Sequence, residues 1–381
     1  MHRIFMLLLK IVGFGLLALV LLVGGLYVYA RLKPRYDRWY YQNLKLKPDV
    51  APTQFDQALV DQLDQHFKNG DFGNTRGFIV WQKGEILYEY AQPGTTLDEK
   101  FRVWSISKSI TSAAYGVGLQ QSQLKPLDEP VVSAFPEYAD AYQSDRRRAA
   151  MTAEDLLTMR SGYNWSELGY PSDYHRMART DDWIAYMAAH EMAQPAGESF
   201  VYNTANTIML AEIIARQTGQ PFEEFVGDQL FGKLGIDDWQ WQYGPNGVVQ
   251  AGGGLSISPN DMLKLGILYL QEGEWEGEQL ISQDWIEVST SPITGDPDYF
   301  EYGYHWWTVP AKHVLSESLA ISDAYFASGL GGNYIWVVPH LDLVIVTTAY
   351  NGGEMELTFP ALRYFIFPAL SAEAKTVSES Q

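Results

Sequence analysis

Two side chains at the start of a predicted helix could together perform nucleophilic chemistry. Ser105 and Lys108 are three residues apart, almost one helical turn, so both would lie on one face. A serine hydroxyl is a poor nucleophile near neutral pH, but a lysine whose pKa is lowered by desolvation can take its proton. The helix N-terminus would stabilise negative charge on the substrate. The same spacing also fits an N-cap serine followed by a solvated lysine.

Two further stretches could complete such a site. Tyr202, just before a predicted helix, could act as general base or proton shuttle if a nearby ammonium lowers the phenol pKa from about 10. It could equally be a buried aromatic residue with a hydrogen-bonded hydroxyl. The glycine-rich stretch 327–333 leads into a predicted strand. Asn333 could offer its backbone N–H as one half of an oxyanion hole, with the Ser105 N–H as the other, or the stretch could be a hairpin turn.

The order of the strands and helices that must position these residues predicts an α+β fold. One antiparallel β-sheet would be built from both ends of the chain, 55–100 and 300–370, flanked by helices, with a helical domain, 101–299, inserted between. Hydrophobic periodicity and turn residues predict the following strands and helices. The strands are 77–81, 86–90, 302–308, 334–338 and 341–350; the helices are 55–67, 152–158, 208–216, one beginning at Pro259, and 354–370, which Pro360 interrupts or starts.

Composition excludes several classes of protein. The chain has 381 residues and a net charge of -19, which argues against a nucleic-acid partner because phosphate contacts need clustered cations. The basic run Arg146–Arg148 is predicted to be a solvated loop face. The chain has no cysteine, which removes disulfides, Cys-ligated zinc and thiol nucleophiles.

The N-terminal region predicts a membrane anchor. Residues 11–30 are uncharged and mostly apolar, and as a helix they would span about 30 Å, the thickness of a bilayer core. A cleaved signal peptide is the alternative, but its apolar run is shorter, about 7 to 15 residues. We therefore expect an anchor with its flank (1–36), a juxtamembrane linker (37–54) and a disordered tail (371–381). The localisation expected is the bacterial inner membrane with a periplasmic catalytic domain, although the flanking charges favour the opposite orientation.

In this order, the three chemical stretches resemble those of the serine β-lactamase and penicillin-binding-protein superfamily. They are most similar to its class C β-lactamase-related branch, which includes DD-peptidases, esterases and 6-aminohexanoate-dimer hydrolases. The likeness extends from about residue 55 to residue 370. It includes three supporting stretches, 155–162, 252–259 and 302–307.

The resemblance implies a role for each motif residue. Ser105 would be the acyl-accepting nucleophile, Lys108 its base, and Tyr202 the tyrosine of the second motif, with Thr204 where relatives carry Asn or Ser. Leu330, Gly331 and Gly332 would match the third motif and bind substrate. Leu330 stands where better-known members have a cation that engages a substrate carboxylate. The leucine favours a neutral ester or amide substrate over a penicillin. The resemblance also implies that no metal or organic cofactor is required.

The sequence also allows alternatives to this hypothesis. Tyr163, Trp165 and Tyr170 could form an aromatic wall over the pocket or could be packing residues. A Ser-His-Asp hydrolase and a zinc enzyme are disfavoured because neither a Gly-x-Ser-x-Gly nor a His-Glu-x-x-His motif occurs, and paired carboxylates of a glycosidase cannot be singled out. The rival from another class is a membrane-tethered sensor or binding module with the same fold.

Overall fold

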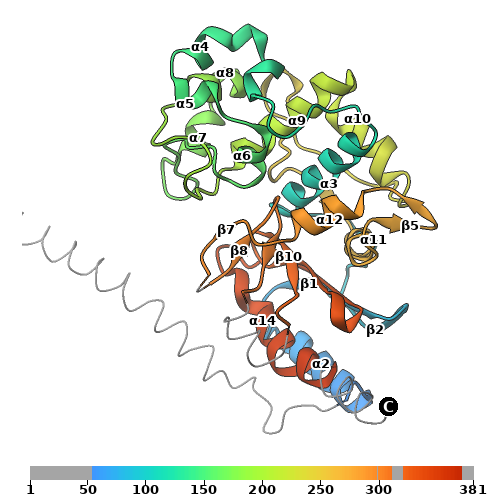
Figure 1. Ribbon diagram of the computed structural model, residues 1–381. Coiled ribbons are helices and arrows are strands. Elements are labelled where there is room, and N and C mark those ends of the chain that lie inside the picture. Colours follow the sequence, from blue (N-terminus) through green and yellow to red (C-terminus); the bar gives the residue numbers. More distant parts are fainter. Residues whose placement is uncertain (1–53, 298, 311–320, 371–381) are drawn as a thin grey trace, which may run out of the picture. The chain divides into compact units, whose positions relative to one another are not determined.

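Strands from both ends of the chain pair into one antiparallel sheet (Figure 1). In the computed structural model, which describes residues 54–297, 299–310 and 321–370, the sheet has the order β2-β1-β12-β11-β10-β9-β8-β7. The N-terminal hairpin thus pairs with the last strand of the chain. The strands of this sheet are β1 (Thr75–Gln82), β2 (Glu85–Ala91), β7 (Thr294–Gly295), β8 (Glu301–Tyr302), β9 (Trp307–Thr308), β10 (Tyr325–Gly329), β11 (Asn333–Val338) and β12 (Leu343–Ala349). The predicted α+β class with an antiparallel sheet flanked by helices is confirmed.

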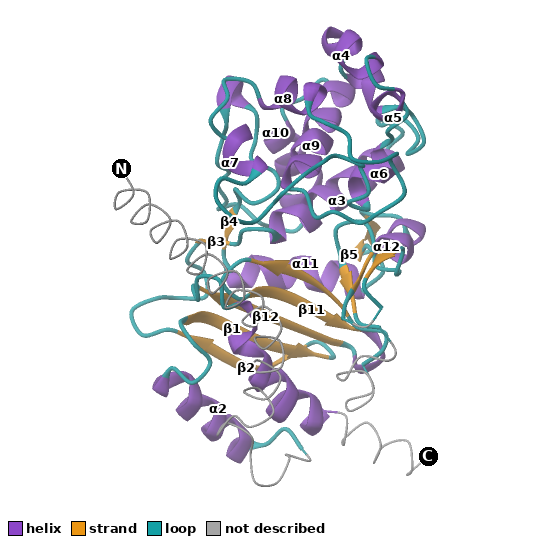
Figure 2. Ribbon diagram, turned by 90° about the vertical axis from the view of Figure 1, so that its left-hand side faces the viewer, coloured by secondary structure: helices purple, strands orange, loops and turns teal. Residues whose placement is uncertain are grey.

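Helices cover both faces of the sheet (Figure 2). Helix α2 and the C-terminal helical segment lie on one face, and α11 lies on the other, below the remaining helices. The central helices are α3 (Ile106–Gln120), α6 (Ala153–Leu157), α9 (Thr204–Thr218), α10 (Phe222–Val226), α11 (Pro259–Leu270) and α12 (Gln283–Ser289). The others are α2 (Gln57–Asn69), α4 (Ala139–Gln143), α5 (Arg146–Ala149), α7 (Asp173–Met177), α8 (Trp183–Ala189) and α14 (Phe359–Ala361). Two small ladders, β3 (Phe101–Arg102) with β4 (Ser256–Ile257) and β5 (Glu274–Trp275) with β6 (Glu278–Gln279), lie outside the main sheet.

Helix α3 is the element that the rest of the fold encloses. It is buried from Ile106 to Gly118, and it contacts α9 in the helical layer as well as β10 and β11 in the sheet. Glycine permits this close packing, because a Cβ on Gly116 would lie 2.5 Å from the ring of Trp285. A helix clamped on both sides holds the side chains at its N-terminus in fixed positions.

Some predicted elements differ from those observed. The predicted strand 302–308 is wrong as a single element, because the chain turns between β8 and β9. In that turn His305 has a φ of 63°, and Gly303 allows close approach, since a Cβ there would lie 2.2 Å from the Ser289 carbonyl oxygen. The run Arg146–Arg148 is helical rather than a loop, and Arg148 is buried. Pro360 stands in the first turn of α14 and therefore starts that helix.

The predicted anchor lies outside the described residues. The same holds for its flank, for all but the last residue of the predicted linker 37–54, and for the tail 371–381. In the part of the chain that the structure does describe, no helix combines the length and the apolar character needed to cross a bilayer.

Candidate active site

Ser105 and Lys108 meet at the N-terminus of α3. Ser105 is the N-cap residue, but its hydroxyl makes no capping bond to the helix backbone. Instead, the Lys108 Nζ lies 3.0 Å from the Ser105 Oγ. The preceding residue, Trp104, has a left-handed backbone with a φ of 51°, a conformation that is uncommon outside glycine and recurs at functional sites. This geometry does not fit a helix-capping serine beside a solvated lysine.

Protein groups enclose the Lys108 side chain. It is 1% exposed, and its Nζ lies 3.0 Å from the Thr204 Oγ1 and donates to the Gly252 carbonyl. Burial lowers the pKa of Lys108 from its ordinary 10.5 to about 8, against an opposing effect of the Glu167 carboxylate. A usable fraction of the side chain is therefore a neutral amine near neutral pH, and a neutral amine can accept the Ser105 proton.

Tyr202 lies beside this pair. Its ring centre is 4.9 Å from the Lys108 Nζ, and its hydroxyl is close enough to Ser105 for that residue to affect its pKa. Burial raises the pKa of Tyr202 well above its ordinary value, an effect that the Ser105 contact opposes and the Glu167 charge reinforces. The condition that a nearby ammonium lowers this pKa is therefore not met, because desolvation dominates. Tyr202 keeps its proton and fits a proton shuttle better than a general base.

The third stretch reaches the segment around Ser105 through a different residue from those predicted. β10 ends at Gly329, and residues 330–332 form the turn that leads into β11. Gly329 adjoins the segment before Ser105, since a Cβ there would collide with the Val103 carbonyl oxygen. Gly331 and Gly332, with φ values of 87° and 96°, turn instead towards the end of β12. Gly331 and Gly332 therefore allow the turn between β10 and β11, whereas Gly329 allows the close approach to the segment before Ser105.

Two backbone N–H groups near this junction are free to bind an anion. Within the described ranges, no hydrogen bond is donated by the N–H of Ser105 or of Leu330. Asn333, the predicted second donor, is instead 1% exposed and lies opposite Gly329 within the sheet. Its side chain donates to the Leu330 carbonyl at 2.7 Å. Because strand pairing takes Asn333 into the sheet, the Leu330 N–H replaces it as the candidate second donor of an oxyanion hole.

Glu167 is the residue near this site that the sequence reasoning missed. It lies in the loop between α6 and α7, and it accepts hydrogen bonds from the Trp165 indole at 2.8 Å and from the Thr204 N–H at 3.0 Å. The Thr204 hydroxyl also bonds to Glu167 and, on its other side, to Lys108. Thr204, 5% exposed, is therefore part of the network around Lys108. The only signal in the sequence was its place among the aromatic residues 163–170.

Those three aromatic residues do not form one surface. Tyr163 is 1% exposed and Trp165 is 8% exposed, whereas Tyr170 is 76% exposed. Tyr163 packs its ring near that of His190, with ring centres 5.8 Å apart. Of the three, Trp165 is the one that touches the network around Lys108, through its bond to Glu167.

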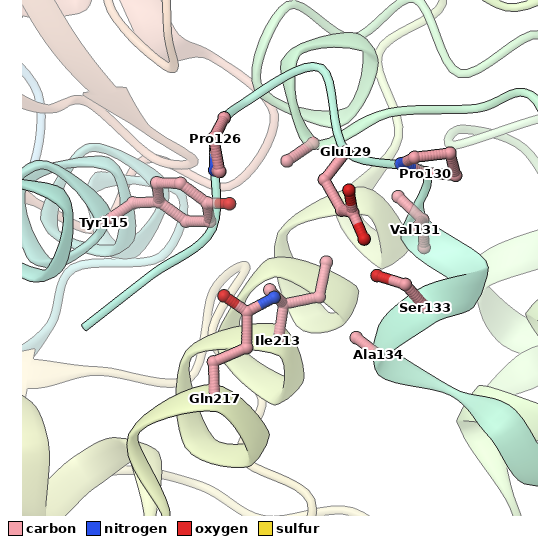
Figure 3. Close-up of a pocket in the computed structure, with 10 residues that line it drawn as sticks. Tyr115, Pro126, Glu129, Pro130, Val131, Ser133, Ala134, Ile213 and Gln217 are labelled. Atoms are coloured by element: carbon pink, nitrogen blue, oxygen red, sulfur yellow. The ribbon is translucent and has the colours of Figure 1, made fainter. Parts of the chain in front are cut away.

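A separate hollow lies at the other end of α3 (Figure 3). It is lined by Tyr115 of α3, by Ile213 and Gln217 of α9, and by the segment 126–134. Glu129 is its one charged lining residue, and none of the residues around Ser105 contributes to it. Across the described residues, no cluster of three or more His, Asp or Glu side chains is placed to hold a metal ion.

The fold and this site define a serine hydrolase of the β-lactamase type. The family model described as beta-lactamase matches residues 63–363, and the chain belongs to that family. One relative, the 6-aminohexanoate-dimer hydrolase of Paenarthrobacter ureafaciens, is 25% identical over 352 residues, covering 82% of this chain and 84% of the relative.

Solved structures share the fold. A putative 6-aminohexanoate-dimer hydrolase from Bacillus anthracis superposes with a TM-score of 0.68 at 19% identity, covering 90% of this chain and 95% of that one. A class C β-lactamase superposes with a TM-score of 0.62 at 17% identity, covering 84% and 95%. The expected likeness to the class C branch of the superfamily is confirmed.

Proposed function

We propose that this serine hydrolase cleaves an ester or amide bond through an acyl-enzyme on Ser105. The observation that carries the proposal is the buried Lys108 Nζ, 3.0 Å from the Ser105 Oγ. A lysine in such surroundings can serve as a general base at near-neutral pH, and a hydroxyl that is not used for capping is available to attack.

The reaction follows from these positions. The neutral Lys108 amine takes the Ser105 proton as the oxygen attacks the substrate carbonyl carbon. The N–H groups of Ser105 and Leu330 bind the resulting oxyanion. The C–O or C–N bond then breaks, and the leaving group receives a proton from Tyr202, which Lys108 reprotonates. In the second half, water takes the place of the leaving group: it gives a proton to Tyr202 as Tyr202 gives one to Lys108, and it attacks the acyl carbon. The acid is released as Lys108 returns a proton to the Ser105 oxygen.

A neutral substrate suits the hairpin beside the nucleophile. Residues 325–333 contain no lysine, arginine or histidine, so this edge offers no cation to a substrate carboxylate. The relative's name, a hydrolase of 6-aminohexanoate dimers, supports an ester or amide substrate over a β-lactam. A β-lactamase or DD-peptidase activity is the alternative within the same chemistry.

The test combines active-site labelling with turnover. A fluorophosphonate should label the wild-type protein at Ser105, and p-nitrophenyl esters should be turned over repeatedly. Ser105→Ala should abolish both, a loss of at least about a thousandfold, while circular dichroism shows an intact fold. Wild-type esterase activity in folded Ser105→Ala protein would disprove the assignment of the nucleophile.

The same experiment separates the enzyme from its rivals. A sensor would release one equivalent of p-nitrophenol and stop, and a binding module would neither label nor release product. Parallel assays with short-chain esters, small amides and a chromogenic cephalosporin would locate the substrate class. Preference for the cephalosporin would replace the esterase proposal by a β-lactamase.

We further propose that residues 11–30 anchor the protein in a bilayer, with the catalytic domain in the periplasm. The length and apolar character of this run support the anchor. In cell fractionation the full chain should remain in the membrane pellet after a high-salt wash, and a chain beginning at residue 54 should not. Recovery of the full chain in the soluble fraction would refute the anchor.

A further inference from the structure

Glu167 holds one end of a chain of hydrogen bonds that leads to the nucleophile. One carboxylate oxygen accepts the Thr204 N–H at 3.0 Å and the Trp165 indole N–H at 2.8 Å. The other bonds to the Thr204 hydroxyl. That hydroxyl is also 3.0 Å from the Lys108 Nζ, which is in turn 3.0 Å from the Ser105 Oγ. The order of the chain is therefore Glu167, Thr204, Lys108, Ser105.

The chemistry of each group determines the direction of every bond. A carboxylate only accepts hydrogen bonds, so the single hydrogen of the Thr204 hydroxyl points to Glu167. The Thr204 oxygen must then accept from Lys108, and the Gly252 carbonyl can only accept as well. Both N–H bonds of a neutral Lys108 amine are thus used. Its remaining position, the lone pair, faces the third neighbour, the Ser105 hydroxyl.

We propose that Glu167 is a positioning residue that aims the Lys108 lone pair at Ser105 through Thr204. The inference rests on the proposed function, since it matters only if Lys108 acts as the base. Without the carboxylate, the Thr204 hydrogen is free to point at the Lys108 nitrogen. The lone pair would then be occupied by Thr204 and unavailable to Ser105.

Among the residues that the structure describes, Glu167 is also the carboxylate whose charge acts on Lys108. It raises the Lys108 pKa, against the larger lowering caused by burial. The other titratable groups facing Lys108 are neutral: burial raises the pKa of Tyr202 and lowers that of His305 to about 3. Loss of the Glu167 charge should therefore move the acid limb of the pH profile to lower pH.

Glu167→Gln tests the proposal, because it keeps the shape of the side chain and replaces an acceptor by a donor. We expect kcat on a p-nitrophenyl ester to fall by about tenfold or more, and the acid limb to shift to lower pH. Glu89→Gln removes an equal charge from the exposed face of β2 and should change neither. A purely structural role for Glu167 would reduce the yield of folded protein but leave kcat of the folded fraction unchanged above the acid limb.

Thr204 provides a second test that does not depend on Glu167 variants folding. Thr204→Ser keeps the bridging hydroxyl and should retain most activity, whereas the nearly isosteric Thr204→Val should lose it. In the Thr204→Val background, Glu167→Gln should lower kcat little further, because the bridge is already broken.

The outcomes separate this inference from the function on which it rests. If wild-type protein neither labels at Ser105 nor turns over esters, the proposed function fails and the inference falls with it. If wild type is active but folded Glu167→Gln keeps its kcat above the acid limb, only the inference is overturned. Equal activities of Thr204→Ser and Thr204→Val would overturn it as well.

Discussion

Two buried cations, each beside a serine, are used for different purposes in this molecule. Lys108 lies 3.0 Å from the Ser105 Oγ, and Arg148 of α5 lies 3.3 Å from the Ser144 Oγ. Both side chains are nearly inaccessible, at 1% and 5% exposed. Both donate to backbone carbonyls, Lys108 to one and Arg148 to two, those of Ala141 and His190.

The difference lies in whether the cation can lose its proton and in what the serine does. A guanidinium stays protonated in proteins, so Arg148 can only donate, and it joins α4 to the chain after α8. The Ser144 hydroxyl is itself engaged, donating to the Ala141 carbonyl at 2.7 Å. Lys108 can become neutral, and Ser105 makes no capping bond. We therefore expect that burial of a cation beside a hydroxyl is not sufficient for a nucleophilic site.

The largest effect on activity should come from replacing Lys108 by arginine, so that the pair with Ser105 resembles the pair of Arg148 and Ser144. Lys108→Arg keeps the positive charge but removes the base, so turnover of p-nitrophenyl esters should fall by about 10²- to 10⁴-fold. The loss should persist at every pH, because the guanidinium does not titrate in the working range. Thermal unfolding followed by circular dichroism would show whether the variant remains folded. A folded Lys108→Arg protein with substantial activity would show that Lys108 is not the base.

The pH dependence should be the next largest effect. The base is the neutral amine, and the pKa of Lys108 is lowered to about 8, so kcat/KM should rise with pH and level off above that value. Below it, the rate should fall about tenfold per pH unit, as the neutral fraction does. Tyr202 and His305 add no limb near neutrality, because burial keeps the phenol protonated and the imidazole neutral. A rate that is flat from pH 6 to pH 9 would contradict the proposed base.

The contrast also shows how far the sequence could predict the site. Ser105 and Lys108 are local, since a helix brings residues three apart onto one face. Tyr202 was found through its position at the start of a helix. Glu167 could not be found this way, because it is one of 46 acidic residues and reaches α9 only through the path of a loop. The burial of Arg148 was missed for the same reason: its carbonyl partners are set by tertiary packing.

The sheet was predicted well where side-chain alternation and turn residues agree. The hairpin of β1 and β2 and the strands β11 and β12 correspond to predicted strands, each within about two residues. The prediction failed where backbone geometry decides: the turn at His305 divides one aromatic run into two strands. The turn after Gly329 likewise moved the functional position of the third motif, because strand register depends on the length of the turn.

The smallest effect on activity should come from replacing Arg148 by lysine, so that the pair with Ser144 resembles the pair of Lys108 and Ser105. Arg148→Lys keeps a cation within reach of Ser144 but cannot span two carbonyls with one planar fork. We expect the free energy of unfolding to fall by about 1 to 3 kcal/mol, the cost of a buried carbonyl left without a donor. Urea unfolding measured by tryptophan fluorescence would report it. The kcat of the folded protein should be unchanged, because α5 contributes no residue to the network around Ser105.

The same variant also asks whether a lysine beside a serine is enough for reactivity. In a Ser105→Ala background, Arg148→Lys should acquire no fluorophosphonate label, because the Ser144 hydroxyl remains bonded to the Ala141 carbonyl. Labelling at Ser144 would mean that proximity to a lysine alone activates a serine in this protein. The bond directions around Lys108 would then have no special part in the chemistry of Ser105.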